Sequence, residues 1–437
     1  MSGGLRRVIE LRHATAMVVG TIVGAAIFVQ PSEVTSQVPS AAGVLGVWLV
    51  AGLLTLVGSL VSAELSSIYT RSGGVYVYLA KSLHPGVGFM WGWAMLLTMH
   101  SGIIAAIATV FARYAGQLFP LGALGQRLVA VGAIVVLSAI NYGGVRAGSR
   151  LQAWFTAGKL LAVAAIVVAG IVAGGGRGGN SWSLSLGGAG WADFLLAVAA
   201  GLFAYGGWHM VTYSAEETVD PRRTIPRALV VGTLVVTFVY MAVNAVYLWV
   251  LPVEVVTGSS RVAAELADSL LGRGGATAMA AIVMFSSFGA LAGIVLAGPR
   301  VYYAMAQDGL LFRWLGDVHP RFGTPHRAIV LQALWSSVLA ATGSFRALFT
   351  RVVYTEWIFF GSMALGLLLL GWRGVRGTTF RIPLFPWTPL LFATAAFLVA
   401  GNAVLSSPLD SAVGLGIVLS GWPLYHWWHK RRLGRAL

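Results

Sequence analysis

The chain has 437 residues, of which 57% are hydrophobic and only 10% are charged, and its mean hydropathy is +0.81. This composition excludes a soluble globular protein, a disordered chain, a coiled coil and a collagen, and it indicates a membrane protein. The chain contains no cysteine, which excludes disulfides, thiolate metal sites and thiol nucleophiles. The formal charge is +15. Because multi-span proteins accumulate basic residues in the loops on one side of the membrane, we interpret this surplus as topology and expect no nucleic-acid partner.

Apolar runs of about 20 residues, the length that crosses the hydrocarbon core of a bilayer, follow one another along the chain. Such runs must be helices, because lipid offers no partner for free backbone groups and the runs lack the alternation of barrel strands. Cutting the chain at charged clusters and at Gly and Pro predicts an all-α membrane protein with twelve spans and no separate soluble domain. Their approximate bounds are 14–36, 43–68, 84–112, 128–143, 151–174, 191–214, 227–251, 275–303, 327–343, 347–370, 387–405 and 409–429.

An even number of spans places both termini on one side, and the basic residues divide unequally between the two sets of loops. We count 21 Arg and Lys residues on the side of the termini, with Arg300 among them. The other side has 7, which are Arg113, Arg127, Arg177, Arg261, Arg273, Arg346 and Arg351. Since cytoplasmic loops retain basic residues, we expect both termini to be cytoplasmic. An Arg-rich, Lys-poor chain without a cleavable leader suits a prokaryote, so the inner membrane is the expected location.

Two of the expected spans contain residues that weaken a helix at mid-membrane depth. The first reads GTIVGAAIF at 20–28, with Pro31 beyond it, and the sixth contains the adjacent pair Gly206 and Gly207. Small residues in membrane helices often mark close packing, which is the alternative interpretation. However, an adjacent pair does not form the usual stripe with four-residue spacing, and each Gly costs about 1 kcal/mol relative to Ala in a helix. We therefore predict that both spans are discontinuous and that their free backbone groups bind a ligand.

Four motifs resemble, in order, those of the amino acid–polyamine–organocation superfamily, and within it the L-type amino acid transporters and their bacterial relatives. They are GTIVGAAIF at 20–28, RSGGVYVYL at 71–79, FAYGGW at 203–208 and EETVDPRRTIP at 216–226. The resemblance covers nearly the whole chain. It implies a LeuT-type fold in a single transmembrane domain, 1–437, with two inverted five-helix repeats at about 14–174 and 191–370 and two additional helices at about 387–429.

The resemblance also implies a substrate site at the two broken helices. The amides of the first break would hold the substrate's carboxylate, and carbonyls of both breaks would hold its ammonium. Carried over position by position, the amides are those of Gly24, Ala25 and Ala26, and the carbonyls are those of Ile22, Phe203 and Gly206. Helix breaks can bind a zwitterion in this way without burying a formal charge of the protein in lipid. The ring of Phe203 would close over the substrate.

Two residues of the candidate site depart from the family pattern. Ala26 replaces the second Gly of the first motif, and its methyl group would narrow the pocket. His209 follows Trp208 where L-type members commonly have Asn, so it could contact the substrate's side chain or titrate near neutral pH. A packing role for His209 is the alternative. These departures leave the identity of the substrate's side chain open.

Lys159 lies eight residues into the fifth expected span, roughly 12 Å from its start, which is almost too deep for its ammonium to reach the interface. A charge at this depth is a functional candidate, and a lysine that only binds helix carbonyls is the alternative. The resemblance implies that Lys159 takes the place of a sodium ion and contacts carbonyls of the first broken helix. A permanently charged Lys159 favours substrate exchange, whereas a neutral one could exchange protons. We expect no sodium coupling.

The sequence therefore predicts a sodium-independent secondary transporter that exchanges neutral L-amino acids by alternating access, with no catalysis, cofactor or metal. A proton-coupled importer of amino acids or organic cations such as polyamines is the second interpretation. A non-transporting receptor, or an intramembrane enzyme using His100, His209 or Glu356, is the alternative from another class, although no catalytic constellation is visible. Animal L-type transporters join a heavy chain through a cysteine. This chain has none, so we expect it to act as a monomer, with the amino acid and the bilayer as its partners.

Overall fold

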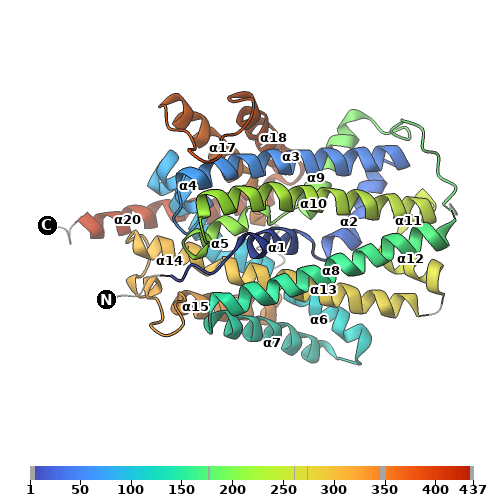
Figure 1. Cartoon of the computed structure of the whole chain (residues 1–437), viewed down its shortest axis with the longest axis horizontal. Coiled ribbons are helices and arrows are strands. Elements are labelled where there is room, and N and C mark those ends of the chain that lie inside the picture. The colour runs from blue at the N-terminus through green and yellow to red at the C-terminus, as the bar shows by residue number, and fades with distance from the viewer. Residues whose placement is uncertain (1–4, 176–177, 260, 273, 345–350, 434–437) are drawn as a thin grey trace.

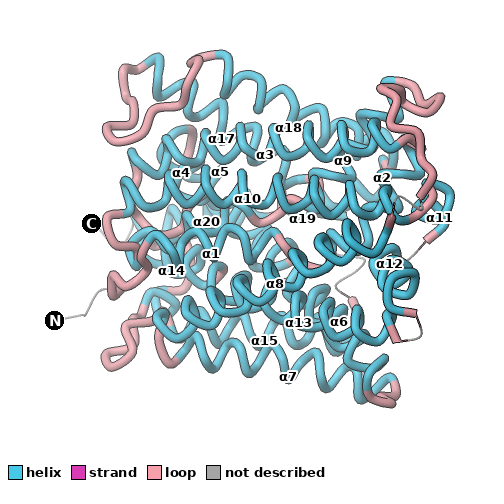
Figure 2. Tube along the Cα trace, turned by 45° about the vertical axis from the view of Figure 1, so that its right-hand side comes forward, coloured by secondary structure: helices cyan, strands magenta, loops and turns pink. Residues whose placement is uncertain are grey.

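The computed structural model of the chain describes residues 5–175, 178–259, 261–272, 274–344 and 351–433. Within these residues the protein is a bundle of helices, and the only β-type pairing is a single bridge between Ile9 and Thr218. The loops lie at the two ends of the bundle (Figure 2), and both chain ends emerge at the same one (Figure 1).

The elements follow one another in a fixed order along the chain. They are α1 (Leu11–Ile22), α2 (Ala26–Gln37), α3 (Ala41–Ile68), α4 (Val75–Ser82), α5 (Pro85–Leu97), α6 (Met99–Leu118), α7 (Ala123–Tyr142), α8 (Val145–Gly174), α9 (Trp191–Ala204), η1 (Trp208–Glu217), α10 (Pro221–Val250), α11 (Val253–Gly258), α12 (Val262–Leu271), α13 (Gly275–Ala297), α14 (Pro299–Gln307), η2 (Arg313–Gly316), α15 (His326–Thr342), α17 (Thr355–Trp372), α18 (Trp387–Ser406), α19 (Pro408–Leu419) and α20 (Gly421–Leu433).

Nine helices in the described part of the chain are long and apolar enough to cross a membrane, or ten if the bent pair α1 and α2 is one span. The all-helical, multi-pass architecture is therefore confirmed. The number of twelve spans stays a prediction, because two expected spans do not reach this length. Helix α15 has only 17 residues, and the last expected span is divided between α19 and α20. The expected span 347–370 begins in residues 345–350, which lie outside the described part of the chain.

Helix α1 lies in the interior of the bundle, between α10, α8 and α13 (Figure 1). Its last nine residues include seven buried ones, which are Ala14 and the six from Met17 to Ile22. Helix α1 ends at Ile22, and α2 begins at Ala26 with an axis bent by 48°. A helix that ends inside the bundle leaves its last carbonyl groups without intrahelical donors, so neighbouring side chains must satisfy them.

One buried carboxylate fastens the segment after α17 to α3. Glu64 is fully buried in α3 and accepts hydrogen bonds from Arg376 Nε at 2.6 Å and Nη2 at 3.2 Å. It also accepts backbone N–H groups of Gly377 at 3.1 Å and Ile382 at 2.8 Å. Because a buried charge is tolerated only when it is paired and hydrogen-bonded, these four donors hold this loop, and α18 beyond it, against α3.

Candidate functional site

The ends of two interrupted helices meet in the interior of the bundle. Helix α9 ends at Ala204, and the chain continues as the 3-10 helix η1 after Gly207, whose φ is +100°. The hydroxyl of Thr21, in the last turn of α1, lies 3.2 Å from the carbonyl oxygen of Gly207. A Cβ atom at Gly207 would lie 3.3 Å from Thr21 Cβ. Glycine is therefore required at 207 both by the left-handed backbone and by the close approach of α1.

Tyr240 of α10 binds the ends of both interrupted helices. Its hydroxyl lies 2.9 Å from the carbonyl oxygen of Ile22, the last residue of α1, and 3.1 Å from that of Ala204, the last residue of α9. One hydroxyl proton is shared between these two acceptors, which are 182 residues apart in the chain. Sequence reasoning missed this residue, because a lone Tyr within an apolar span is typical of packing. Its hydroxyl group could have indicated a structural role, because a tyrosine hydroxyl buried in a membrane helix needs a hydrogen-bond partner.

Lys159 of α8 binds the carbonyl groups at the end of α1. Its ammonium donates to the carbonyl oxygens of Gly20 at 2.9 Å and Val23 at 2.8 Å, and the side chain is 2% exposed. These carbonyls belong to the negative end of the α1 dipole, which favours a cation. Among the described residues no carboxylate forms an ion pair with Lys159. The positive charge is therefore balanced by backbone dipoles alone.

Helix α13 makes room for the lysine side chain. A Cβ atom at Gly289 of α13 would lie 2.7 Å from both Lys159 Cε and Phe155 Cβ, so any side chain at 289 would displace the lysine. One turn earlier, the hydroxyl of Ser286 lies 3.4 Å from the carbonyl oxygen of Gly24. Helices α8 and α13 thus both contact the segment between α1 and α2.

The residues expected to bind substrate occupy two different kinds of position. Ala25 and Ala26 are half-buried at the start of α2, where the first amide groups have no intrahelical acceptors and form the positive end of the helix. Phe203, in the last turn of α9, and Gly206, two residues beyond its end, are exposed. The amide end of α2 and the carbonyl ends of α1 and α9 therefore lie at the interruptions, an arrangement that can receive a group carrying both charges.

His209, by contrast, lies in an aromatic cluster. Its ring is 4.8 Å from that of Phe360, 5.3 Å from Trp208, 5.6 Å from Tyr213 and 6.0 Å from Trp91, centroid to centroid. The side chain is 2% exposed, and its Nδ1 atom has no hydrogen-bond partner among the described residues. These contacts match the packing alternative, and they place His209 away from the exposed face that carries Phe203.

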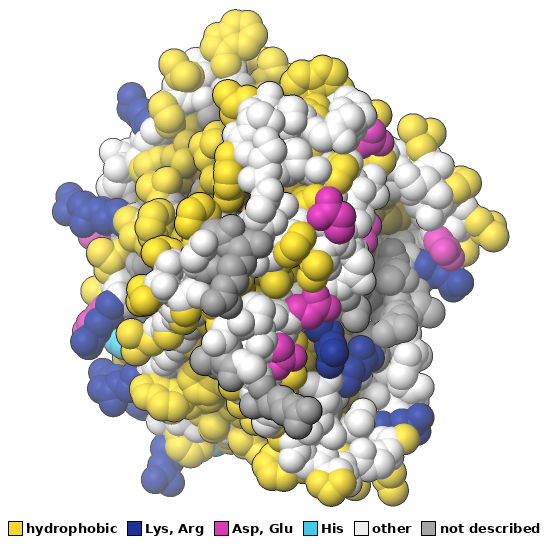
Figure 3. Space-filling view, turned by 90° about the vertical axis from the view of Figure 1, so that its right-hand side faces the viewer, with side chains coloured by type: hydrophobic (Ala, Val, Ile, Leu, Met, Phe, Trp, Pro, Cys, Tyr) yellow, Lys and Arg dark blue, Asp and Glu magenta, His cyan; other side chains and the backbone are white. Residues whose placement is uncertain are grey.

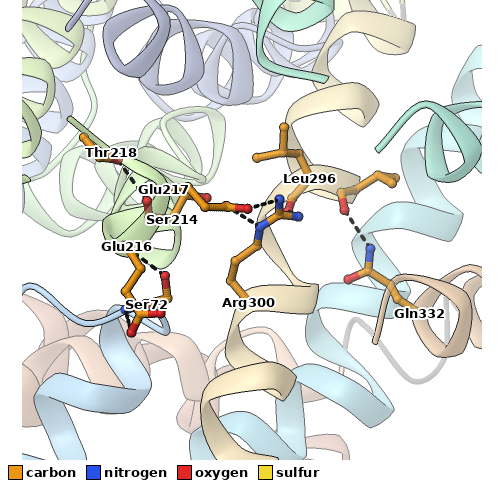
Figure 4. Close-up of polar contacts among 9 residues, drawn as sticks. Ser72, Ser214, Glu216, Glu217, Thr218, Leu296, Arg300 and Gln332 are labelled. Carbon is orange, nitrogen blue, oxygen red and sulfur yellow. Dashed lines mark hydrogen bonds and ion pairs between the residues drawn. The ribbon is translucent and has the colours of Figure 1, made fainter. Parts of the chain in front are cut away.

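A fully buried ion pair joins η1 to α14 near the end of the bundle that carries the termini. Arg300 Nε and Nη2 donate to the two carboxylate oxygens of Glu217 at 2.8 and 2.9 Å, and Nη1 donates to the carbonyl oxygen of Leu296 at 2.6 Å (Figure 4). Both side chains have no exposed surface. Arg300 was counted with the basic loop residues on the side of the termini, although it lies within the expected span 275–303. The structure places it in α14, buried and paired, so it does not belong in that count.

Several further contacts tie η1 to neighbouring segments at this end. The backbone N–H groups of Val8 and Ile9 donate to the carbonyl oxygen of Glu217 at 2.8 and 2.9 Å. Glu216 and Ser72 exchange two hydrogen bonds between backbone and side chain (Figure 4). The segment before α1, the loop before α4, and α14 are thereby all connected to the end of η1. An opening between α1 and η1 at this end requires these contacts to separate.

The bridging role of Tyr240 can be tested with a matched pair of variants. Tyr240→Phe removes the shared hydroxyl and leaves the carbonyls of Ile22 and Ala204 without that donor, so the free energy of unfolding should fall by about 1 kcal/mol. Tyr247→Phe is the control, since Tyr247 is a buried residue of the same helix whose hydroxyl has no hydrogen-bond partner among the described residues. Unfolding in detergent micelles measures the stability, and hydrogen exchange in peptides covering 20–26 and 204–208 should rise only in Tyr240→Phe. Equal behaviour of the two variants would show that the bridge does not hold the helix ends.

Comparison with known proteins gives the family to which these features belong. The family described as "Amino acid permease" matches residues 9–416. The serine/threonine exchanger SteT of Bacillus subtilis is 30% identical over 433 residues, covering 98% of each chain. The human large neutral amino acids transporter small subunit 2 is 33% identical over 459 residues, covering 98% of this chain and 83% of its own. The human cystine/glutamate transporter is 29% identical, with 97% and 85% covered. The chain therefore belongs to the amino acid permease family of the amino acid–polyamine–organocation superfamily, and it is a membrane transporter of amino acids rather than an enzyme.

Proposed function

We propose that the protein exchanges neutral L-amino acids across the membrane by alternating access and without sodium. The observation that carries this proposal is the ammonium of Lys159 on the carbonyl oxygens of Gly20 and Val23, at the interrupted end of α1. A cation fixed by a covalent side chain satisfies these carbonyls permanently. A second cation at the same place would be repelled and would have no free acceptors.

The substrate's backbone groups would bind to helix ends in this proposal. The carboxylate lies at the amides of Gly24, Ala25 and Ala26, where the α2 dipole is positive, and the ammonium lies at carbonyls of Ile22, Phe203 and Gly206. The carbonyl oxygen of Ile22 already accepts from Tyr240, but a carbonyl has a second lone pair. Phe203 covers the bound substrate, and His209 packs in its aromatic cluster without contacting the substrate. Because these helix ends carry partial charges in balance, they favour a substrate without net charge.

The family supports an architecture of two inverted repeats, at about 14–174 and 191–370, with two further helices at about 387–429 in one domain. We place both termini in the cytoplasm and the protein in the cell inner membrane. Arg300 is buried and no longer counts as a loop residue, so 20 of the 21 basic residues remain on the side of the termini. The other side has 7, and the excess on the side of the termini therefore persists. Of those 7, Arg177, Arg273 and Arg346 lie outside the described residues. Figure 3 looks onto the end opposite the termini, where acidic side chains gather near the centre of the face.

We further propose that the protein works as a monomer without a heavy chain. Four of the animal relatives are named as small subunits, whereas the name of the bacterial relative is that of an exchanger and mentions no subunit. The absence of cysteine from the sequence removes any disulfide to a partner.

The test is exchange in proteoliposomes that contain the purified protein. Vesicles preloaded with unlabelled neutral amino acids, in choline medium and without a pH gradient, should take up a labelled neutral amino acid at least ten times faster than empty vesicles. Replacing choline by sodium should leave the rate unchanged. Uptake that requires sodium would contradict the proposed role of Lys159, and a failure to transport any member of a neutral panel under any loading would contradict the substrate class.

A second candidate function, proton-coupled import of amino acids or organic cations, is favoured by Glu356 of α17. This carboxylate is half-buried within a candidate membrane span, forms no hydrogen bond or ion pair with other described residues, and is close enough for its charge to act on Tyr213. An unpaired carboxylate at such a position is a candidate proton site.

The two functions differ in what drives accumulation. If protons are coupled through Glu356, empty vesicles in acidic medium should accumulate substrate, and Glu356→Gln should abolish that accumulation while leaving exchange between preloaded vesicles and medium. For a pure exchanger, empty vesicles should show no acid-driven accumulation, in the wild type or in the variant. Labelled uptake with and without an imposed pH gradient distinguishes these results.

A further inference from the structure

A groove runs along the outside of the bundle between α7 and α15, which lie side by side in both views (Figures 1 and 2). It is lined by eight residues of these two helices, including Val135, Ala139 and Tyr142 of α7 and Val330, Ala333 and Leu334 of α15. Its volume is about 340 Å³, roughly ten times that of one water molecule in the liquid. This space is large enough to hold a segment of a hydrocarbon chain.

The walls of this groove are apolar. Val135, Val330 and Leu334 are 51%, 45% and 63% exposed, on helices that belong to a multi-pass membrane protein. The small side chains of Ser138, Ala139 and Ala333 also line the groove, and a larger residue at these positions would fill space between the helices. A hydrocarbon chain matches such a lining, because it leaves no polar group of a ligand unsatisfied.

The groove ends among basic and aromatic side chains at the end of the bundle that carries the termini. Arg327 precedes Val330 by three residues and Leu334 by seven, so it stands on the same face of α15 as the groove wall. The ring of Tyr142, which closes the α7 side, lies 5.5 Å from that of His319 and 5.8 Å from that of His326. This contact shows that the start of α15 and the end of α7 meet here.

Positive charge predominates at this point. The exposed Arg321 forms no ion pair with a described acidic residue, and its guanidinium lies 5.5 Å from the centroid of the Phe322 ring. Arg327 pairs with Asp317 at 2.6 Å, with both side chains about half exposed. The Nδ1 atom of His326 is buried without a partner among the described residues. These two guanidinium groups are accompanied by one paired carboxylate, that of Asp317, which leaves capacity for an anion.

We propose that this groove binds a phospholipid with an anionic headgroup, whose acyl chain lies between α7 and α15 and whose phosphate contacts Arg321 and Arg327. An apolar groove that ends in basic residues at the membrane surface complements a lipid of this charge better than a zwitterionic one. The site lies on the outside of the bundle, so it is independent of the identity of the transported substrate.

The experiment compares phosphatidylglycerol with phosphatidylcholine of identical acyl chains, added to the delipidated protein in detergent and counted by native mass spectrometry. The wild type should bind one phosphatidylglycerol at least ten times more tightly than one phosphatidylcholine. Since each basic residue near an anionic surface contributes about 1 kcal/mol, or about five-fold in affinity, R321Q/R327Q should lose this preference. R373Q is the matched control, because Arg373 is an exposed arginine that lies outside the groove, and it should retain the preference.

Two further measurements keep the proposal falsifiable if a variant is poorly folded. Ala333→Trp fills the groove and should weaken both lipids alike, with its thermal midpoint in lipid-free detergent as the check on folding. In the wild type, the stabilisation by phosphatidylglycerol should shrink when NaCl is raised from 0.05 to 0.5 M, because salt screens the headgroup contact. Equal affinity for the two lipids in the wild type, or an undiminished preference in R321Q/R327Q, would overturn the proposal.

Discussion

The contact between the Lys159 ammonium and the last turn of α1 is the interaction on which the rest of the interior depends. A helix that stops in the middle of a membrane exposes carbonyl groups for which lipid provides no donor. Lys159 reaches these groups from α8 at 2.8 and 2.9 Å, and it does so as a full charge set against a helix dipole. Gly289 leaves the space that the side chain needs. Without the ammonium, these carbonyl groups need another donor, such as a cation or water.

The interruption between α9 and η1 contacts the interruption between α1 and α2. Gly207 turns the chain where Thr21 approaches, and Tyr240 shares one hydroxyl between the ends of α1 and α9. Apart from Lys159, none of these groups carries a formal charge, so the interruptions present partial charges of both signs. Formal charges are concentrated near the termini instead, where Glu217 and Arg300 neutralise each other out of contact with solvent. The interior can thus receive a zwitterion while the polar contacts at one end hold α1, η1 and α14 together.

Sequence reasoning succeeded where a residue conflicts with its surroundings. A lysine inside an apolar run and two adjacent glycines in a span can be recognised from the sequence without knowing what they contact. The apolar runs predicted the membrane class and the helical architecture, and the glycines predicted the weak points of the two helices. Tyr240, Arg300 and Glu64 were missed or left without a role, because their hydrogen-bond partners are distant in the sequence. Arg376, for example, is 312 residues from Glu64. A tyrosine within an apolar span looks like a packing residue, and an arginine near the end of a span looks like a loop residue. The surroundings of His209 likewise include rings from two other helices, Trp91 of α5 and Phe360 of α17, which no local pattern records.

The most direct measurement is chemical rescue of Lys159→Ala. This substitution removes four atoms, three carbons and the ammonium nitrogen, which n-propylammonium replaces atom for atom. The account predicts that exchange of a labelled neutral amino acid by this variant in choline medium falls at least ten-fold and that n-propylammonium or sodium restores a substantial part of it, with no effect of either ion on the wild type. If the variant exchanges at the wild-type rate in choline, or if its lost activity responds to neither cation while the variant remains folded, the ammonium does not act as a built-in cation and the account is contradicted.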